Sequence, residues 1–217
     1  MSDKEKIVIE EREDGPLVVK NLQRLEMPDS SACQVRPAMA LCRCGASSRK
    51  PFCDGSHMKT GFSSKRVDVS GRDRIYSYEG KEISVFYNRI LCSHAGKCSA
   101  LLNSAFDPSR KPWIIPENGT VEEIKNVVAA CPSGALRFSR PEEHVNAAHI
   151  ESEDCVIKIE KDGPYHVCNI DLQDVRWAEG ASQRKFVLCR CGKSGNKPFC
   201  DGAHYDQNWS EEDTAAD

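Results

Sequence analysis

The stretch Cys42-Arg-Cys-Gly-Ala-Ser-Ser-Arg-Lys-Pro-Phe-Cys-Asp-Gly-Ser-His57 decides how this chain is organised. It recurs without a gap as Cys189-Arg-Cys-Gly-Lys-Ser-Gly-Asn-Lys-Pro-Phe-Cys-Asp-Gly-Ala-His204. Each copy places three thiols and one imidazole within sixteen residues. A hydrophobic core does not need this pattern, whereas thiolate and imidazole together suit zinc, copper(I) or an iron–sulfur cluster.

The spacing inside each copy narrows the choice of metal. Cys42 and Cys44 are one residue apart, so an extended backbone can direct both sulfur atoms the same way. Asp54-Gly55 is a turn signal that can open a short helix, with Asp54 as its N-cap. Such a helix would carry His57 and direct backbone N–H groups at a negatively charged cluster. The spacing is a poor match to the cysteine pairs of zinc fingers, although the ligands alone would accept zinc.

Both stretches resemble the CDGSH iron–sulfur domain family, whose pattern is C-x-C-x2-[ST]-x3-P-x-C-D-G-x-H. Ser47 and Pro51 stand at the required offsets in the first copy, as do Ser194 and Pro198 in the second. Only Ala203 departs from the literal family name, at a position that is not a ligand. The resemblance implies one [2Fe–2S] cluster in each copy, held by three cysteines and one histidine. The implied ligands are Cys42, Cys44, Cys53 and His57 in the first copy, and Cys189, Cys191, Cys200 and His204 in the second.

The composition favours small modules, each stiffened by a metal, over one large core. The 217 residues are 39% hydrophobic and 29% charged, with a net charge of −3 and no basic nucleic-acid footprint. No apolar run approaches the roughly 18 residues that span a membrane, and residues 1–6 lack the apolar core of a signal peptide. Twelve cysteines without an export signal argue for metal in a reducing compartment. We therefore expect a cytoplasmic protein without membrane or nucleic-acid partners.

The repeat is longer than the metal-binding motif. Residues 7–9 and 17–19 form a predicted β-hairpin, and the same plan returns over residues 156–167. A further predicted strand leads into the first cysteine of each copy, at residues 39–41 and 186–188. The CDGSH family pairs such strands across a homodimer. The resemblance therefore implies that the two copies pair inside one chain, as a pseudo-dimer within a monomer.

The middle of the chain is a copy of neither unit. Residues 74–87 predict a hairpin, a short helix is expected near residues 100–102, and residues 113–116 are a candidate strand. A clear helix starts at Thr120, because Thr120 and Glu123 form a capping box before an apolar face of helical spacing. That helix delivers Cys131 at its end, where a proline stops it, and a closing strand follows.

Three cysteines of this middle segment resemble those of a single-cluster bacterial ferredoxin. Cys92, Cys98 and Cys131, which is followed by proline, match most closely the divergent mono-cluster ferredoxin modules. Ala95 stands where the second ferredoxin cysteine would be, and it cannot bind iron. Three thiolates suit a [3Fe–4S] cluster, whereas a [4Fe–4S] cluster would need another fourth ligand, for which His94 is one residue out of register. A ferredoxin-shaped module without a cluster and a zinc site stay open.

The predicted fold class is α+β, with two small β-rich CDGSH units and a small α+β ferredoxin-like module. The first unit would cover residues 1–66, the middle module 67–140 and the second unit 141–209. Residues 210–217 are acidic and small, and we expect them to be disordered.

The family resemblance implies one-electron transfer coupled to protonation at His57 and His204. A neutral imidazole ligand should raise the reduction potential, as in Rieske centres, and it can take up a proton. Arg43 and Arg190 could offset the cluster charge, or they could be solvated. The alternatives are a cluster storage, cluster transfer or redox-sensing module, and a zinc-stapled scaffold. Expected partners are a redox protein or an apo-acceptor of a cluster. The sequence has no glycine-rich phosphate-binding loop and no Ser/His/Asp catalytic set, so an enzyme is the least favoured hypothesis.

Overall fold

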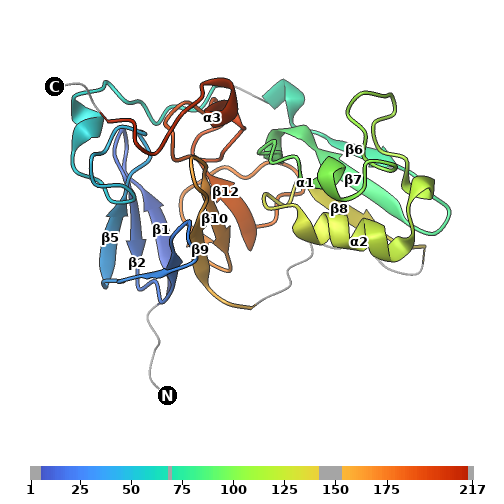
Figure 1. The fold of residues 1–217 in the computed structure, drawn as a ribbon, viewed down its shortest axis with the longest axis horizontal. Helices are drawn as coiled ribbons and strands as arrows, with labels where there is room; N and C mark the ends of the chain where they lie inside the picture. The colour runs from blue at the N-terminus through green and yellow to red at the C-terminus, as the bar shows by residue number, and fades with distance from the viewer. Residues whose placement is uncertain (1–5, 68–69, 142–152, 215–217) are drawn as a thin grey trace, which may run out of the picture.

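The computed structural model describes residues 6–67, 70–141 and 153–214, which form three β-sheets and few helices (Figure 1). This is an α+β, strand-rich architecture, as predicted. None of the helices in these ranges has the length and apolar character that a membrane crossing requires. The helices are α1 (Lys97–Leu101), α2 (Val121–Ala130) and α3 (Ala203–Asp206), with short 3-10 turns η1 (Ser56–Met58), η2 (Ser70–Arg72), η3 (Arg89–Leu91) and η4 (Pro116–Asn118).

The described residues form twelve strands, which include the predicted hairpins. In chain order they are β1 (Val8–Glu11), β2 (Leu17–Lys20), β3 (Leu25–Glu26), β4 (Ala32–Cys33), β5 (Ala38–Leu41), β6 (Ile75–Tyr78), β7 (Ser84–Asn88), β8 (Leu136–Ser139), β9 (Val156–Ile159), β10 (Tyr165–Cys168), β11 (Asp171–Leu172) and β12 (Lys185–Leu188). The strands β3, β4 and β11 are additional to those that the sequence predicts.

The two copies exchange strands. In the first sheet β1, β2 and β5 of the first copy are joined by β11 of the second, in the order β11-β1-β2-β5. In the second sheet β12, β10 and β9 are joined by β3 and β4 of the first copy, in the order β12-β10-β9-β3-β4. Both exchanged pairs, β1 with β11 and β9 with β3, are parallel. The relation is reciprocal, because β9 is the counterpart of β1 and β11 that of β3.

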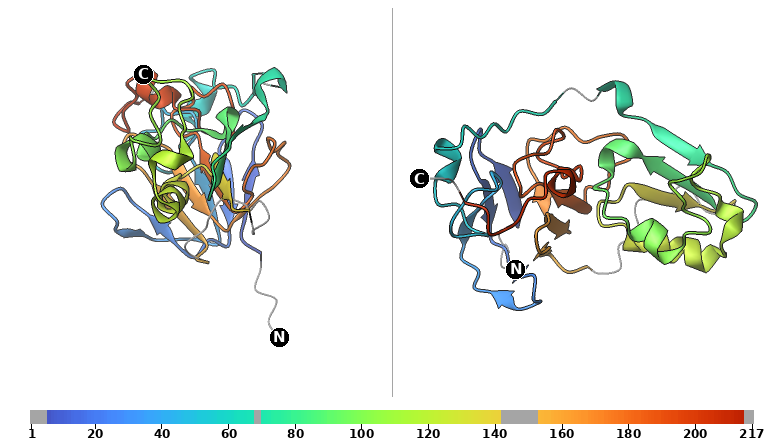
Figure 2. Two further views of the ribbon diagram at one scale, coloured as in Figure 1. Left: turned by 90° about the vertical axis from the view of Figure 1, so that its right-hand side faces the viewer. Right: turned by 45° about the horizontal axis from the view of Figure 1, so that its top comes forward.

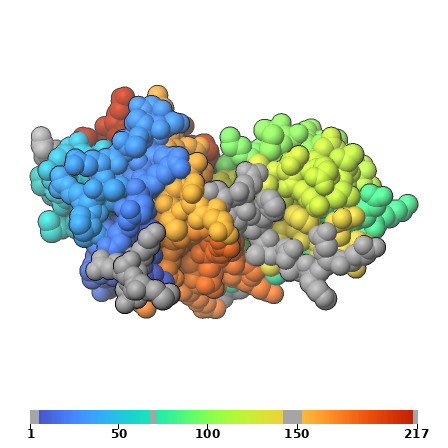
Figure 3. Space-filling view, turned by 90° about the horizontal axis from the view of Figure 1, so that it is seen from below, coloured from blue at the N-terminus to red at the C-terminus, as the bar shows by residue number. Residues whose placement is uncertain are grey.

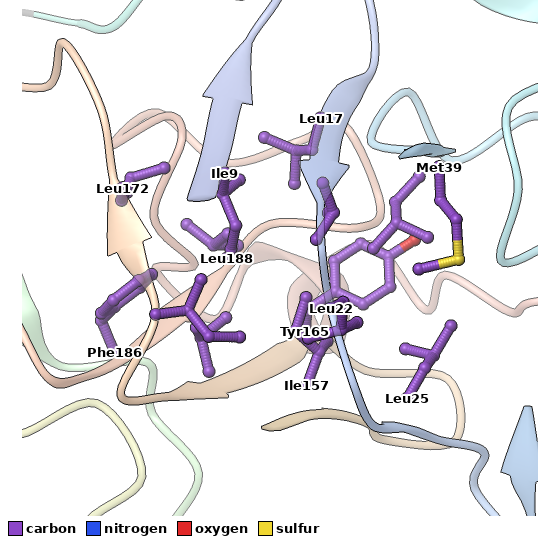
Figure 4. Packing of buried hydrophobic residues seen from close by; sticks show 14 of the residues in the cluster. Ile9, Leu17, Leu22, Leu25, Met39, Ile157, Tyr165, Leu172, Phe186 and Leu188 are labelled. Atoms are coloured by element: carbon purple, nitrogen blue, oxygen red, sulfur yellow. The ribbon is translucent and has the colours of Figure 1, made fainter. Parts of the chain in front are cut away.

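One hydrophobic core lies between these two sheets and draws on both copies (Figure 4). Ile9, Leu17 and Leu25 of the first copy pack with Ile157 and Leu188 of the second, all at most 1% exposed. A small sheet with one apolar face must bury that face against another element, and here each copy provides that partner for the other. The shared core is therefore what holds the two copies together.

The middle module has its own sheet and core. Strands β6, β7 and β8 pair in that order, all antiparallel, and α2 packs against them through Ile124, Val127 and Val128. The predicted capping box is confirmed, since Thr120 Oγ1 accepts from the Glu123 N–H and the Glu123 carboxylate accepts from the Thr120 N–H. Ala178 of the second copy is also part of this core. The second copy thus lies between the first copy and the middle module (Figures 2 and 3).

Some local expectations are corrected. The candidate strand at 113–116 is only an isolated bridge between Phe106 and Ile114, because Pro116 starts the 3-10 turn η4. The helix that carries His57 is a single 3-10 turn capped by Gly55, whose φ of 92° is left-handed. The tail that we expect to be disordered is described up to residue 214, and there the Glu211 carboxylate binds Arg190. Residues 215–217 of that tail lie outside the described residues.

Candidate metal centres

Each CDGSH-like loop is closed by a pair of backbone hydrogen bonds across its base. The Cys42 N–H donates to the Pro51 carbonyl and the Cys53 N–H donates to the Ala40 carbonyl, both at 2.8 Å. The second copy repeats this pattern with the N–H groups of Cys189 and Cys200, at 2.8 and 2.9 Å. Strands β5 and β12 therefore fix where both loops start and where their third cysteine stands.

The four predicted ligands of each copy lie as two pairs. Cys42 Sγ is 3.6 Å from Cys44 Sγ, and Cys53 Sγ is 3.4 Å from His57 Nδ1. The second copy gives 3.7 Å between the Cys189 and Cys191 sulfur atoms and 3.5 Å between Cys200 Sγ and His204 Nδ1.

These distances suit two ligands on one tetrahedral metal. With metal–sulfur and metal–nitrogen bonds of about 2.3 and 2.0 Å, two such donors stand roughly 3.5–3.8 Å apart. Among the residues that the structure describes, no group of three or more Cys, His, Asp or Glu side chains has the arrangement of a single-ion site. The donors of each copy therefore offer two pairs, each with the spacing of two ligands on one metal.

An aspartate in each motif fixes the turn that carries the histidine. Asp54 Oδ1 accepts from the Ser56 N–H at 3.0 Å, while Oδ2 accepts from the Ser48 N–H at 2.8 Å. Asp201 makes the equivalent bonds, to the N–H groups of Ala203 and Gly195. Burial raises the pKa of Asp54, but its hydrogen bonds from Ser56 and Ser48 outweigh this and lower it overall. This carboxylate stays ionised and ties the two ends of the loop together.

Electrostatics within the sulfur pairs favour one thiolate in each. The hydrogen bond from Cys44 lowers the pKa of Cys42 to about 6, and the same bond raises the pKa of Cys44. In the second copy the pKa of Cys189 falls to about 7 for the same reason, while burial raises that of Cys200. Metal binding requires thiolates, and this pairing favours the thiolate form of Cys42 and of Cys189.

The two metal-binding loops touch each other across the boundary between the copies. A Cβ added to Gly45 would lie 2.3 Å from the Cys191 carbonyl oxygen, and one added to Gly192 would lie 2.5 Å from the Cys44 carbonyl oxygen. Both glycines have φ near 80°, a left-handed conformation that favours glycine. The two sites are therefore neighbours, with backbone in contact between them.

Two aromatic residues that follow the motifs complete this boundary, and the sequence reasoning missed this role. Phe62 and Trp209 each stand five residues after a predicted ligand histidine. Arg43 lies over Phe62 at 5.5 Å and Arg190 lies over Trp209 at 5.0 Å. Trp209 Nε1 also donates to the Gly45 carbonyl at 3.1 Å. The shared offset from the histidines was the available signal.

Tyr165 is a second residue whose role was not predicted. Its hydroxyl donates to the Cys42 carbonyl at 2.7 Å and lies 3.2 Å from the Pro51 carbonyl, so the second copy supports the first metal-binding loop. The side chain is fully buried, and burial raises its pKa well above the usual value. Its counterpart in the first copy is Leu17, so this support has no equivalent in the other direction.

The two motif arginines are buried and paired, which settles whether they are solvated. Arg43 Nε donates to the Gly15 carbonyl at 2.7 Å, Nη2 donates to the Arg12 carbonyl at 2.6 Å, and Nη1 pairs with Glu11. Arg190 pairs with Glu211 in the same way. Both guanidinium groups therefore tie the loop to the chain around it, and a carboxylate partner reduces the charge that either could present to a cluster.

The three middle cysteines converge on one small cavity. Cys92, Cys98 and Cys131 line it together with Tyr87 and Trp113, and its volume is about 30 Å³. Burial raises the pKa of Cys92 to about 11. A set of three thiols suits the chemistry of a cluster, although the cavity would have to widen to admit one.

The His94 side chain is not among the residues that line that cavity, although the His94 N–H donates to Cys92 Sγ at 3.4 Å. It is exposed, and a Cβ on Gly202 of the second copy would lie 2.9 Å from His94 Cβ. Two buried serines, Ser93 and Ser133, line the cavity instead.

Comparisons with known proteins match two family profiles to separate parts of the chain. A family profile described as iron-binding zinc finger, CDGSH type, matches residues 14–58 and 162–205, and one described as divergent 4Fe-4S mono-cluster matches residues 78–141.

Several curated proteins are similar to parts of the chain. A Drosophila ananassae protein named CDGSH iron-sulfur domain-containing protein 2 homolog is 33% identical over 107 residues, 48% of this chain and 68% of that protein. The uncharacterized protein YjdI of Escherichia coli K12 is 39% identical over 61 residues, 28% of this chain and 80% of its own length. Rat CDGSH iron-sulfur domain-containing protein 1 is 40% identical over 52 residues, 24% of this chain and 42% of that protein. No solved structure matched the chain.

Proposed function

The chain belongs to the CDGSH iron–sulfur domain family, and from this premise we propose that it transfers single electrons by means of two [2Fe–2S] clusters and a third cluster of the [3Fe–4S] or [4Fe–4S] type. The observation that carries the proposal is the arrangement of the predicted ligands as two pairs in each copy, at 3.4–3.7 Å within a pair. When bound, such clusters supply one-electron chemistry, and the protein supplies orientation and electrostatics.

The proposed ligands are those that the sequence indicated. Each [2Fe–2S] cluster would be held by three cysteines and one histidine, and the middle cluster by three cysteines. The ligand sets are Cys42, Cys44, Cys53 and His57; Cys189, Cys191, Cys200 and His204; and Cys92, Cys98 and Cys131.

The two histidines give the proposed electron transfer its coupling to protons. In each, Nδ1 faces the neighbouring cysteine sulfur, at 3.4 Å for His57 and 3.5 Å for His204. Nε2 is then the ring atom that can hold a proton. Burial lowers the pKa of His204, and its Nε2 is buried without a hydrogen-bond partner. We therefore expect burial to disfavour proton uptake at His204.

We further propose that the strand exchange is an intramolecular counterpart of a homodimer, so that the protein works as a monomer. The reciprocal pairing of β1 with β11 and of β9 with β3 supports this. We propose a ferredoxin-like role for the middle module, since α2 ends at Cys131 beside Cys92 and Cys98. We propose the reducing cytoplasm as the location of the protein, because cysteines there stay available to hold metal.

A redox titration followed by EPR tests the proposal. We expect each histidine-bearing site to take up one electron, and we expect rapid exchange of electrons with a reductase. Clusters that stay oxidised under every reductant tried would contradict electron transfer.

A second function, donation of a cluster to an apo-protein, is favoured by one observation. Cys53 and His57 of the first copy are partly exposed, so this ligand pair is accessible to an acceptor. Incubation with an apo-ferredoxin discriminates the two functions. Loss of colour from this protein, with gain of colour by the acceptor, would favour donation, whereas electron exchange without loss of colour would favour transfer.

A further inference from the structure

The two copies have almost identical motifs, but their predicted ligands differ greatly in exposure to solvent. In the second copy all four predicted ligands are buried, at 2%, 3%, 3% and 4% exposure for Cys189, Cys191, Cys200 and His204. In the first copy only Cys42 is buried, while Cys44, Cys53 and His57 are partly exposed. Because the motifs match, the difference comes from what covers each loop.

The middle module covers the second copy. Asn196 Nδ2 donates to the Ile90 carbonyl at 2.9 Å in a buried contact. His94 lies directly against Gly202, beside the ligand pair of that copy. Arg49, the counterpart of Asn196 in the first copy, is exposed. The first loop therefore has no such cover from the residues that the structure describes.

The surface beside the third cysteine of the motif is also covered in the second copy and open in the first. In the second copy Trp177 packs against Phe199 with ring centres 5.0 Å apart. In the first copy the counterpart of Phe199, Phe52, instead lines a groove of about 420 Å³ that reaches Cys53. We call this the Cys53 groove.

The Cys53 groove and a second cavity that opens onto the first copy are both lined by basic side chains. Arg36 and Arg49 line the Cys53 groove. A second cavity, of about 500 Å³, reaches Cys44, and we call it the Cys44 cavity. The basic residues that line it are Lys65, Arg66, Lys193 and Lys197. Among the described residues no carboxylate lines either opening, although the whole chain is net negative. Such a local field attracts and orients an acidic protein surface.

We propose that the first copy is the exchange site of this protein, where an acidic partner protein docks over the Cys53 groove and the Cys44 cavity, while the middle module closes the second copy to such partners. The inference rests on the proposed electron transfer and assigns its outer contact: the partner meets the first copy, and the second copy communicates only inside the molecule.

Access of a chelator to each site tests the division of roles without relying on electron transfer. The dithionite-reduced holoprotein is mixed at neutral pH with bathophenanthroline disulfonate, an anionic chelator of ferrous iron, and the coloured chelate is followed with time. We expect the first copy to release its iron about tenfold faster than the second, because the second site must first open locally.

Ligand variants assign the phases of iron release. Cys53→Ser should remove the fast phase and Cys200→Ser a slow one. If either variant fails to fold by circular dichroism, His57→Cys and His204→Cys keep four ligands and identify each site by its shifted visible band. Asn196→Ala should accelerate release from the second copy, whereas Arg49→Ala, at the equivalent position, should not accelerate release from the first.

Charge reversal tests the preference for an acidic partner. Lys65 and Lys193 are exposed residues of the Cys44 cavity, and the double variant Lys65→Glu/Lys193→Glu should slow the fast phase about fivefold with the anionic chelator. With uncharged bipyridine the same variant should release iron at the wild-type rate. Lys81→Glu/Lys111→Glu, in the middle module, makes the same change in net charge and should alter neither rate.

Equal release rates for the two copies, or equal effects of both charge reversals, would overturn this inference and leave the proposed function standing. A protein that holds no iron would overturn both.

Discussion

His57 and His204 are the residues whose chemistry separates these sites from sites with four cysteines. Each offers Nδ1 to the site beside a cysteine sulfur. Replacement by cysteine adds a negative charge, so we predict that His57→Cys and His204→Cys each keep a cluster and lower its reduction potential, on the order of 100 mV.

The pH dependence of the reduction potential provides a second test of the histidine ligands. A histidine ligand that takes up a proton on reduction makes the potential fall as pH rises, whereas a thiolate ligand should give a flat profile. Voltammetry across pH measures both effects. Unchanged potentials in both variants would contradict the proposed ligation.

Arg43 is the second residue with a measurable role. It is 2% exposed, pairs with Glu11 and holds two backbone carbonyls. Removal of one partner from a buried pair costs about 3 kcal/mol. We predict that Arg43→Ala lowers the thermal unfolding midpoint by roughly 6–12 °C.

Lys6→Ala is the matched control for Arg43. Lys6 pairs with Asp171 at the surface, where its side chain is 73% exposed, and such pairs are worth less than about 1 kcal/mol. Equal thermal unfolding midpoints for the two variants would contradict a contribution of the buried Arg43 pair to stability.

At the scale of elements, the contact between the two metal-binding loops makes a specific prediction. Gly45→Ala would place a Cβ 2.3 Å from the Cys191 carbonyl oxygen, so the second loop must move as well. We predict a large loss of iron from both copies, although the change lies in only one of them.

Gly61→Ala is the control at a similar backbone angle. Gly61 also has a left-handed φ, of 62°, but nothing lies within 4 Å of its added Cβ. We expect that variant to keep its iron, apart from a modest loss of stability. Retention of all iron in Gly45→Ala, or loss confined to the first copy, would contradict contact between the loops.

The elements also show what the sequence could and could not predict. Hairpins such as β1–β2 and β9–β10 can be predicted from apolar runs that are separated by Asp-Gly-Pro turns. The exchanged strands β3 and β11 have only two residues each, so they carry no local pattern. Their pairing depends on where the other copy lies, and that information is not local.

At the scale of the whole molecule, the three candidate sites lie in a row: the first copy, then the second copy, then the middle module. The first copy touches the second through Gly45 and Gly192, and the second touches the middle module through Gly202 and His94. The motifs alone predicted three sites and their residue types. They could not predict the order of the sites in space or their unequal burial, because nearly identical motifs acquire different surroundings only in the folded chain.

The whole account depends on redox clusters in these sites, and one sample can test this directly. The protein would be purified without oxygen and examined by visible absorption and EPR, with iron, sulfide and zinc assays. The account predicts a brown protein with roughly seven or eight irons, with a [3Fe–4S] or [4Fe–4S] signal beside those of the [2Fe–2S] sites. A colourless protein with stoichiometric zinc would contradict it.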